Sequence, residues 1–148
     1  MERQCRKRLV AILLAIALVP FAVACSAQAP STVPIMTITE PTNGAILQGP
    51  QVKITVQVVN WKLVDAGSPV AQGEGHLHFF IDQPASAIPV GQLIPTRDPA
   101  YVHVGATPYT SRELDLRPGQ HTITAVMGDS NHAALTQPAP QTVTVTVK

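Results

Sequence analysis

Residues 52–58 read VKITVQV and residues 142–147 read TVTVTV. In both stretches valine or isoleucine alternates with a polar residue, and successive side chains of a β-strand point to opposite faces of a sheet. β-Branched residues also pack well on the pleated surface of a strand. Both stretches are therefore predicted to be strands with one face buried.

Outward from these two stretches, further segments have strand length and end at glycine or proline turns, namely residues 35–39, 75–82, 112–116 and 121–127. No sustained helical period interrupts them. Six or seven short strands within residues 35–148 predict an all-β, immunoglobulin-like β-sandwich. Residues 83–110 hold several prolines, so we expect an irregular excursion with at most one or two edge strands.

The N-terminal segment has the layout of a secretory signal. Four basic residues within the first eight precede an uncharged apolar run over residues 9–24. This run holds Pro20 and is shorter than the roughly 20 apolar residues of a membrane-spanning helix. The sequence AVAC at 22–25 resembles a bacterial lipobox, in which the cysteine is lipidated and becomes the first residue. Ordinary cleavage after Ala24 is the alternative, because lipoboxes prefer leucine where this chain has Ala22.

Three segments follow from this interpretation: a signal peptide over residues 1–24, the lipidated Cys25 with a flexible tether over residues 25–34, and the sandwich over 35–148. Residues 25–148 suffice for one core and are too few for two ordinary domains. The expected location is the periplasmic or extracellular face of a membrane, to which the acyl chains hold the domain.

Charge and cysteine content exclude several classes of function. After removal of the signal peptide, six basic residues remain against eight acidic ones, a net charge of −2, which argues against nucleic-acid binding. Cys5 leaves with the signal peptide and Cys25 would carry lipid, so the domain has no thiol for a disulfide or a cysteine-ligated zinc. No nucleophile elbow or dinucleotide-binding motif occurs, so we do not expect an enzyme.

Histidine is the residue type that can carry chemistry here. His76 and His78 lie in GEGHLHFFID at 73–82, and side chains two apart on a strand share a face, so their imidazoles project side by side. The opposite face would carry Leu77 and Phe79 into the core. An HxH pair can grip one metal ion, although a solvated polar outer face is an alternative interpretation.

Sandwich topology brings further residues towards this pair. If residues 75–82 and 121–127 are the antiparallel third and sixth strands, the start of one meets the end of the other. His132 would then converge with the HxH pair, and Met127 would lie close by as a thioether donor. Imidazoles with a thioether suit copper, and imidazoles alone also suit zinc. Neutral imidazoles are required, so binding should be lost below about pH 6.

The remaining candidates have supporting roles. His121 follows Pro118-Gly119 at the corner that enters the sixth strand, where sandwich domains often place a tyrosine that bonds to backbone. We therefore expect His121 to be structural and distant from His76. Asp82 and Asp129 are either solvated charges or carboxylates that orient ligand histidines. The position of His103, in the irregular excursion, does not follow from the sequence.

The run GEGHLHFFID, then LRPGQHTITAVMGDSNHAAL, then TVTVTVK resembles a family of uncharacterised exported bacterial domains with an HxHxxxD strand, a PGxH corner and a GDxxH loop. The resemblance covers roughly residues 36–148 and implies an immunoglobulin-like sandwich. Its motifs map onto His76, His78, Asp82, His121, Asp129 and His132. Such domains commonly continue the loop histidine with proline and another histidine, whereas this chain has Ala133-Ala134, which removes one ligand candidate.

Two functions thus remain open from the sequence. One is a lipid-anchored metal-binding protein of the cell envelope, holding copper or zinc through His76, His78 and His132. The other is a non-catalytic surface module without metal, whose outer sheet or residues 83–110 contact a protein or glycan.

Overall fold

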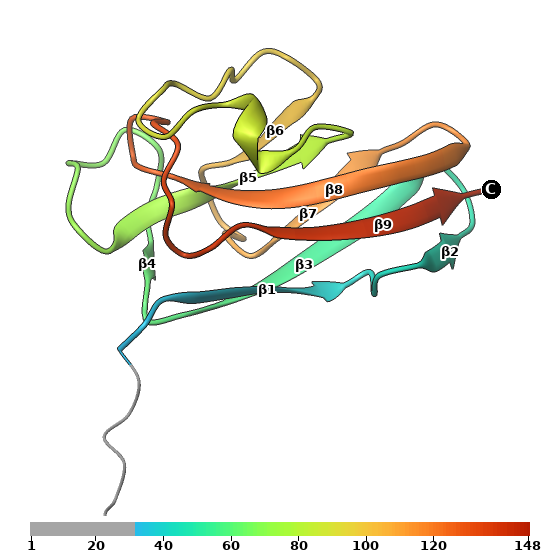
Figure 1. Cartoon of the computed structure of the whole chain (residues 1–148), viewed down its shortest axis with the longest axis horizontal. Coiled ribbons are helices and arrows are strands. Elements are labelled where there is room, and N and C mark those ends of the chain that lie inside the picture. The colour runs from blue at the N-terminus through green and yellow to red at the C-terminus, as the bar shows by residue number, and fades with distance from the viewer. Residues whose placement is uncertain (1–31) are drawn as a thin grey trace, which may run out of the picture. The chain divides into compact units, whose positions relative to one another are not determined.

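Two β-sheets face each other in the computed structural model, which describes residues 32–148 (Figure 1). The predicted signal peptide, Cys25 and most of the predicted tether lie outside the described residues. The described part has its own hydrophobic core, as an independently folding domain requires. Within it, no helix is long and apolar enough to cross a membrane.

The smaller sheet has three antiparallel strands in the order β1 (Ile35–Glu40), β3 (Gln51–Val59) and β7 (Ser111–Asp115). Its central strand, β3, contains the VKITVQV stretch. Val52, Ile54 and Val56 are buried while the exposed Lys53 and Gln57 alternate with them, as the period of two predicts.

The larger sheet has the order β2-β9-β8-β5-β4, with β6 paired to β5. Its strands are β2 (Ala45–Leu47), β4 (Lys62–Leu63), β5 (Glu74–Ile81), β6 (Tyr101–Val104), β8 (Gly119–Gly128) and β9 (Gln141–Val147). The short strands β2 and β4 pair in parallel with β9 and β5, and the other pairings are antiparallel. The predicted immunoglobulin-like sandwich is confirmed.

The main core fills the space between the sheets with side chains from both inner faces. The buried members are Met36, Val52, Ile54, Val56, Leu77, Phe79, Val104, Leu114, Leu116, Ile123, Ala125, Met127, Val143, Val145 and Val147. Only every second side chain of a strand points into this core. The side chains between them lie on the outer face of the sheet, and their burial depends on which loops cover that face.

A smaller apolar cluster lies on the outer face of the larger sheet and consists of Phe80, Ile94, Val126 and Ala134. The segment between β5 and β6, with the short helix η1 (Ala85–Ala87), and the loop after β8 cover this face (Figure 1). Strand β5 is therefore buried on both faces. The alternative of a solvated outer face on this strand is wrong, because residues 83–110 fold back over it.

Candidate metal centre

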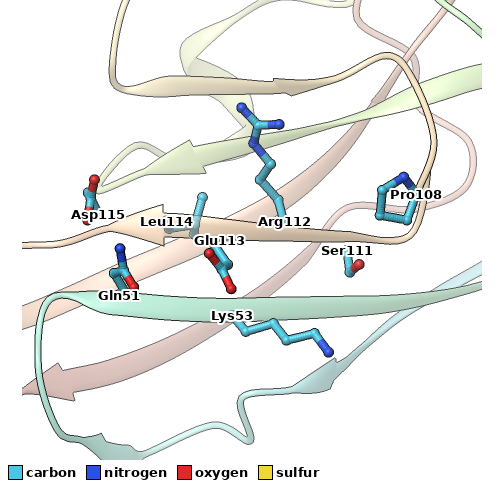
Figure 2. A pocket seen from close by; sticks show the side chains of 8 residues that line it. All are labelled: Gln51, Lys53, Pro108, Ser111, Arg112, Glu113, Leu114 and Asp115. Atoms are coloured by element: carbon cyan, nitrogen blue, oxygen red, sulfur yellow. The ribbon is translucent and has the colours of Figure 1, made fainter.

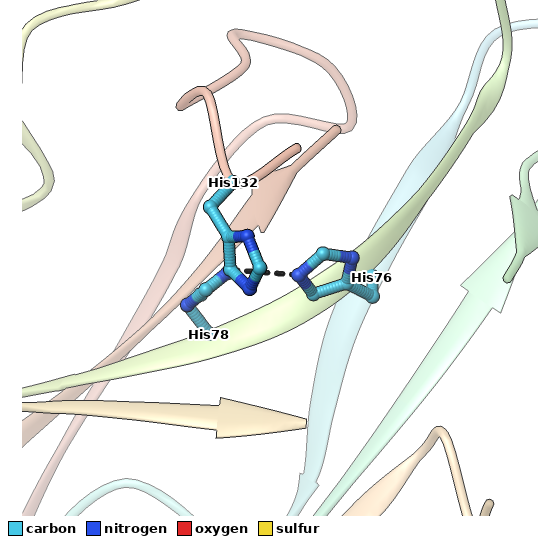
Figure 3. Close-up of side chains that lie close together, drawn as sticks. All are labelled: His76, His78 and His132. Carbon is cyan, nitrogen blue, oxygen red and sulfur yellow. Dashed lines mark hydrogen bonds between the residues drawn. The ribbon is translucent and has the colours of Figure 1, made fainter. Parts of the chain in front are cut away.

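Strand β5 presents His76 and His78 on the covered outer face. Leu77 between them and Phe79 after them point into the main core, as the alternation predicts, and both histidines have no exposed surface. The Nε2 atoms of His76 and His78 lie 3.0 Å apart, so a ring N–H of one donates to the other (Figure 3).

The loop after β8 delivers His132 to the same place. His76 pairs with Gly128 in the antiparallel register of β5 and β8, so the chain leaves β8 beside His76. Asp129 then shapes the loop, because its Oδ1 accepts hydrogen bonds from the backbone N–H groups of Asn131 and Ala133 at 2.8 and 2.9 Å. His132 itself adopts the left-handed conformation, with φ of 71°. Its ring turns back towards β5 (Figure 3), and one ligand nitrogen from each of the three histidines lies within 4.8 Å of the others.

His103 adds a fourth imidazole from strand β6. It stands directly opposite His78 in the antiparallel pairing of β5 and β6, so both side chains project from the same face. The Nε2 atoms of His103 and His132 are 3.3 Å apart. We call His76, His78, His103 and His132 the four-histidine cluster.

The four rings lie at the corners of a nearly regular tetrahedron. The six distances between ring centroids are 4.8, 4.9, 4.9, 5.3, 5.5 and 4.8 Å. Four imidazoles around one ion with bonds of about 2.0 Å would have nitrogens about 3.3 Å apart and centroids about 5.2 Å apart. The ring positions match this arrangement. Among His76, His78 and His132 the ligand nitrogens lie up to 4.8 Å apart, so this separation would shrink by roughly 1.5 Å on coordination.

Burial keeps the two central imidazoles uncharged. Desolvation, with repulsion from His103 and His132, lowers the pKa of His76 from 6.5 to about 4. Desolvation and the other three histidines lower the pKa of His78 to about 2. The pKa of His103 is also lowered, mainly by burial. Neutral imidazole is the form that binds a metal, so the fold prepares these side chains as ligands.

Two imidazole nitrogens of the four-histidine cluster have no partner in the described part of the chain. The Nδ1 atoms of His76 and His78 are buried and have no hydrogen-bond partner within residues 32–148. Leaving a buried polar atom unpaired costs about 1–3 kcal/mol, so a stable core would not place histidine here without another gain. Metal coordination at Nε2 would offset this cost, while Nδ1 itself would stay unpaired.

Two glycines leave room for the rings. A Cβ atom at Gly128 would lie 3.0 Å from Nε2 and 3.1 Å from Cδ2 of His78. A Cβ atom at Gly105 would collide with the His103 ring. A side chain at either position would occupy space that these two rings fill, so both glycines allow the rings to take their places in the cluster.

The cluster is reached from the side of His103 and His132, which are partly exposed. A polar pocket of about 250 Å³ borders His103 and is lined also by Thr107, Ser111 and Arg112. A larger groove of about 530 Å³ over β3 and β7 contains none of the four histidines (Figure 2). The Arg112 side chain extends away from β3 in that view and lines both spaces.

Residues 54–148, which include the four-histidine cluster, match a family model described as Domain of unknown function (DUF4399). The chain belongs to the DUF4399 family. This agrees with the resemblance to uncharacterised domains, and no curated protein matches the sequence.

Solved structures similar to this DUF4399 domain include two with low sequence identity. Fibronectin(III)-like modules of CbhA from Clostridium thermocellum are 18% identical, with a TM-score of 0.47, over 77% of this chain and 97% of that one. An engineered protein is 13% identical, with a TM-score of 0.45, over 78% of this chain and 20% of that one.

Met127 does not join the histidines of the DUF4399 domain. It pairs with Leu77, and both side chains lie in the main core between the sheets. Val126, the neighbour of Met127 on β8, is the residue that pairs with His78 and lies on the outer face. The predicted thioether ligand is therefore wrong. Side chains alternate along β8, so Val126 faces the outer side of the sheet and Met127 faces the main core.

His121 and Asp82 form a separate pair at the other end of β5. The His121 Nδ1–H donates to Asp82 Oδ2 at 2.8 Å, and Nε2–H donates to the Arg117 carbonyl at 2.9 Å. The carboxylate raises the pKa of His121, so both nitrogens carry protons. Asp82 Oδ1 also accepts from the Thr122 N–H at 2.8 Å. These contacts fix the corner that enters β8 and touch no ligand candidate.

His103 is the candidate ligand whose position the sequence did not give. Val102 and Val104 alternate with Tyr101 and His103, which is a strand signal of four residues only. That alternation indicates that His103 points away from the core. It carries no information on which strand β6 joins, so the pairing with His78 appears only in the tertiary structure.

Proposed function

We propose that this DUF4399 domain binds one transition-metal ion, copper or zinc, through the four-histidine cluster. The observation that carries the proposal is the convergence of four imidazoles from three separate parts of the chain at tetrahedral spacing. The unpaired Nδ1 atoms support it, because burying polar rings without a ligand costs stability. A surface module without metal would gain nothing from this arrangement.

Binding rather than catalysis is the role that the donor set favours. Catalytic zinc sites keep one position open for water, whereas sites with four protein ligands are closed. All four positions of a tetrahedral ion are taken here if His103 coordinates. We therefore propose a non-catalytic protein that holds its ion for storage, transfer or stability.

The cell envelope is the proposed location. Support comes from the signal-like residues 1–24 and the lipobox-like sequence that ends at Cys25. Expression of the full chain in a bacterium, with labelled palmitate, should give a labelled membrane-bound product, and Cys25→Ser should give an unlabelled one. Equal labelling of both proteins would contradict the anchor.

Metal titration of residues 32–148 tests the binding proposal. This part of the chain contains its own core and neither cysteine, so thiols cannot compete for the ion. We expect one equivalent to bind, and His76→Ala/His78→Ala to abolish saturable binding. His103→Ala should weaken binding at least tenfold. His121→Ala is the matched control, because this histidine contacts Asp82 and Arg117 instead of the cluster.

Two results would contradict the proposal: no saturable binding by the unmodified domain, or equal affinity in the double variant. Loss of binding in the His121→Ala control without loss of folding would also contradict it, because the effect would then not be local to the cluster. Circular dichroism of each variant separates unfolding from loss of ligands.

A further inference from the structure

The charge of the donor set restricts which ion the four-histidine cluster can hold well. Its donors are four imidazole nitrogens, all neutral when bound. Within residues 32–148 the carboxylate that acts on the cluster is that of Asp129, which attracts the charged form of His76. Oδ1 of Asp129 is occupied by two backbone N–H groups of the loop. This one carboxylate offsets at most one unit of charge, so a bound divalent ion would keep a net positive charge.

The surroundings make that charge costly. His76 and His78 are fully buried, and the outer-face apolar cluster of Phe80, Ile94, Val126 and Ala134 lies alongside them. Arg112 adds a positive charge on the side of His103. The cost of moving an ion from water into a medium of low dielectric constant rises with the square of its charge. The desolvation penalty of a divalent ion is thus about four times that of a monovalent ion of the same size.

The geometry of the cluster also disfavours one divalent ion, Cu(II). Divalent copper prefers a square-planar or tetragonal arrangement of nitrogen ligands. Flattening the tetrahedron would move the rings of His78 and His103 out of the spaces that the absence of a side chain at Gly128 and Gly105 leaves for them. A closed-shell ion with no preference of its own accepts the tetrahedral arrangement without such movement.

We propose that the four-histidine cluster is selective for monovalent copper over divalent copper and zinc. Zinc fits the geometry but carries twice the charge, and divalent copper fits neither the geometry nor the charge. Imidazole is a suitable ligand for copper, and the domain achieves the selectivity without the thiolate or thioether ligands usual for the monovalent ion. This inference rests on the proposed function, metal binding by the same histidines.

Competition titrations of residues 32–148 test the selectivity. Cu(I) is titrated without oxygen against a chromophoric Cu(I) chelator in the presence of ascorbate, and Cu(II) and Zn(II) are titrated against their own chelators. We expect one Cu(I) per chain, with a dissociation constant at least 100-fold below those of the two divalent ions. X-ray absorption of the Cu(I) form should show nitrogen neighbours only.

A charge-changing variant separates the electrostatic argument from geometry. His103→Asp replaces one neutral ligand on an edge strand by a carboxylate, which compensates a divalent ion better. We expect the ratio of Zn(II) to Cu(I) affinity to rise at least tenfold. His103→Ala is the matched control, because it removes the same ring without adding charge and should not shift the ratio towards zinc to this extent.

The outcomes distinguish this inference from the proposed function. Saturable zinc binding that is as tight as or tighter than that of Cu(I) would overturn the selectivity and leave metal binding intact. Tight Cu(II) binding with a tetragonal paramagnetic resonance spectrum would do the same. Absence of saturable binding by any of the three ions would overturn both. An unchanged affinity ratio in His103→Asp would refute the role of charge.

Discussion

The metal-free domain should lose stability steeply between pH 6.5 and pH 4 because of two buried histidines. Unfolded histidine titrates near pH 6.5, whereas the folded domain holds the pKa of His76 at about 4 and that of His78 at about 2. Below pH 6.5 the unfolded state therefore binds protons that the folded state does not. Stability consequently falls as the pH falls.

The size of the effect follows from the lowered pKa values. One unit of pKa difference corresponds to about 1.4 kcal/mol, so His76 alone contributes a loss on the order of 3 kcal/mol by pH 4. His78 contributes a similar loss over the same interval, since its folded pKa is lower still. A domain of this size has a free energy of unfolding of roughly 5–15 kcal/mol, so protonation linked to these two histidines removes a large part of it.

The double variant His76→Leu/His78→Leu isolates this contribution. Leucine has no titrating group and suits a site that packs beside Ile94 and Val126. Urea unfolding, followed by the fluorescence of the sole tryptophan, Trp61, gives the free energy of unfolding of both proteins at pH 7.5, 6, 5 and 4.5. The variant should be as stable as the parent at pH 7.5 or more stable, since two unpaired Nδ1 atoms are removed.

The gap between the two proteins should then widen in favour of the variant by several kcal/mol towards pH 4.5. Parallel pH profiles would refute the reasoning, because they would mean that the folded and unfolded states titrate these histidines alike. Carboxylates remote from the cluster affect both proteins equally and cancel in the difference between the profiles, whereas Asp129, which interacts with His76, does not cancel.

Three further predictions concern residues around the cluster and at the opposite corner. Gly128→Ala places a Cβ 3.0 Å from the His78 ring, so metal affinity measured by chelator competition should fall at least tenfold while the circular dichroism spectrum keeps its β-sheet form. Asp129→Ala removes the acceptor for two loop N–H groups and should weaken metal binding, whereas Asp129→Asn, which keeps a side-chain oxygen, should retain most of it; equal affinities of the two variants would contradict this. His121→Gln should cost about 1–3 kcal/mol in urea unfolding at pH 6, where the His121–Asp82 pair is charged, and progressively less as the pH rises through the raised pKa of His121; a cost that grows with pH would show the opposite sign.

Much of the sandwich could be predicted from the sequence because its signals are local. Alternation at residues 52–58 and 142–147 placed β3 and β9, and the glycine-bounded segments gave β5 and β8. The antiparallel pairing of those two strands is confirmed by the register of His76 with Gly128. Strands β2 and β4 were not predicted, since two or three residues carry no measurable period and their parallel pairing depends on distant partners.

The candidate site was predicted in part for the same reason. A period of two makes His76 and His78 neighbours in any strand, and a strand-to-loop junction made the approach of His132 predictable. Met127 was misplaced because a residue can be near a site along the chain and still face the other side of its sheet. His103 could not be placed, because the partner of a four-residue edge strand is a long-range property.

The sequence by itself determined an alternating β-chain, two histidines on one face of a strand, and the signal-like segment before them. Only the tertiary structure decided that this face is buried and that His103 and His132 close around it. The physical reason is that side-chain direction follows from local backbone geometry. Burial, the lowered pKa of His76 and the tetrahedral spacing arise when residues 83–110 and the loop after β8 pack over the sheet.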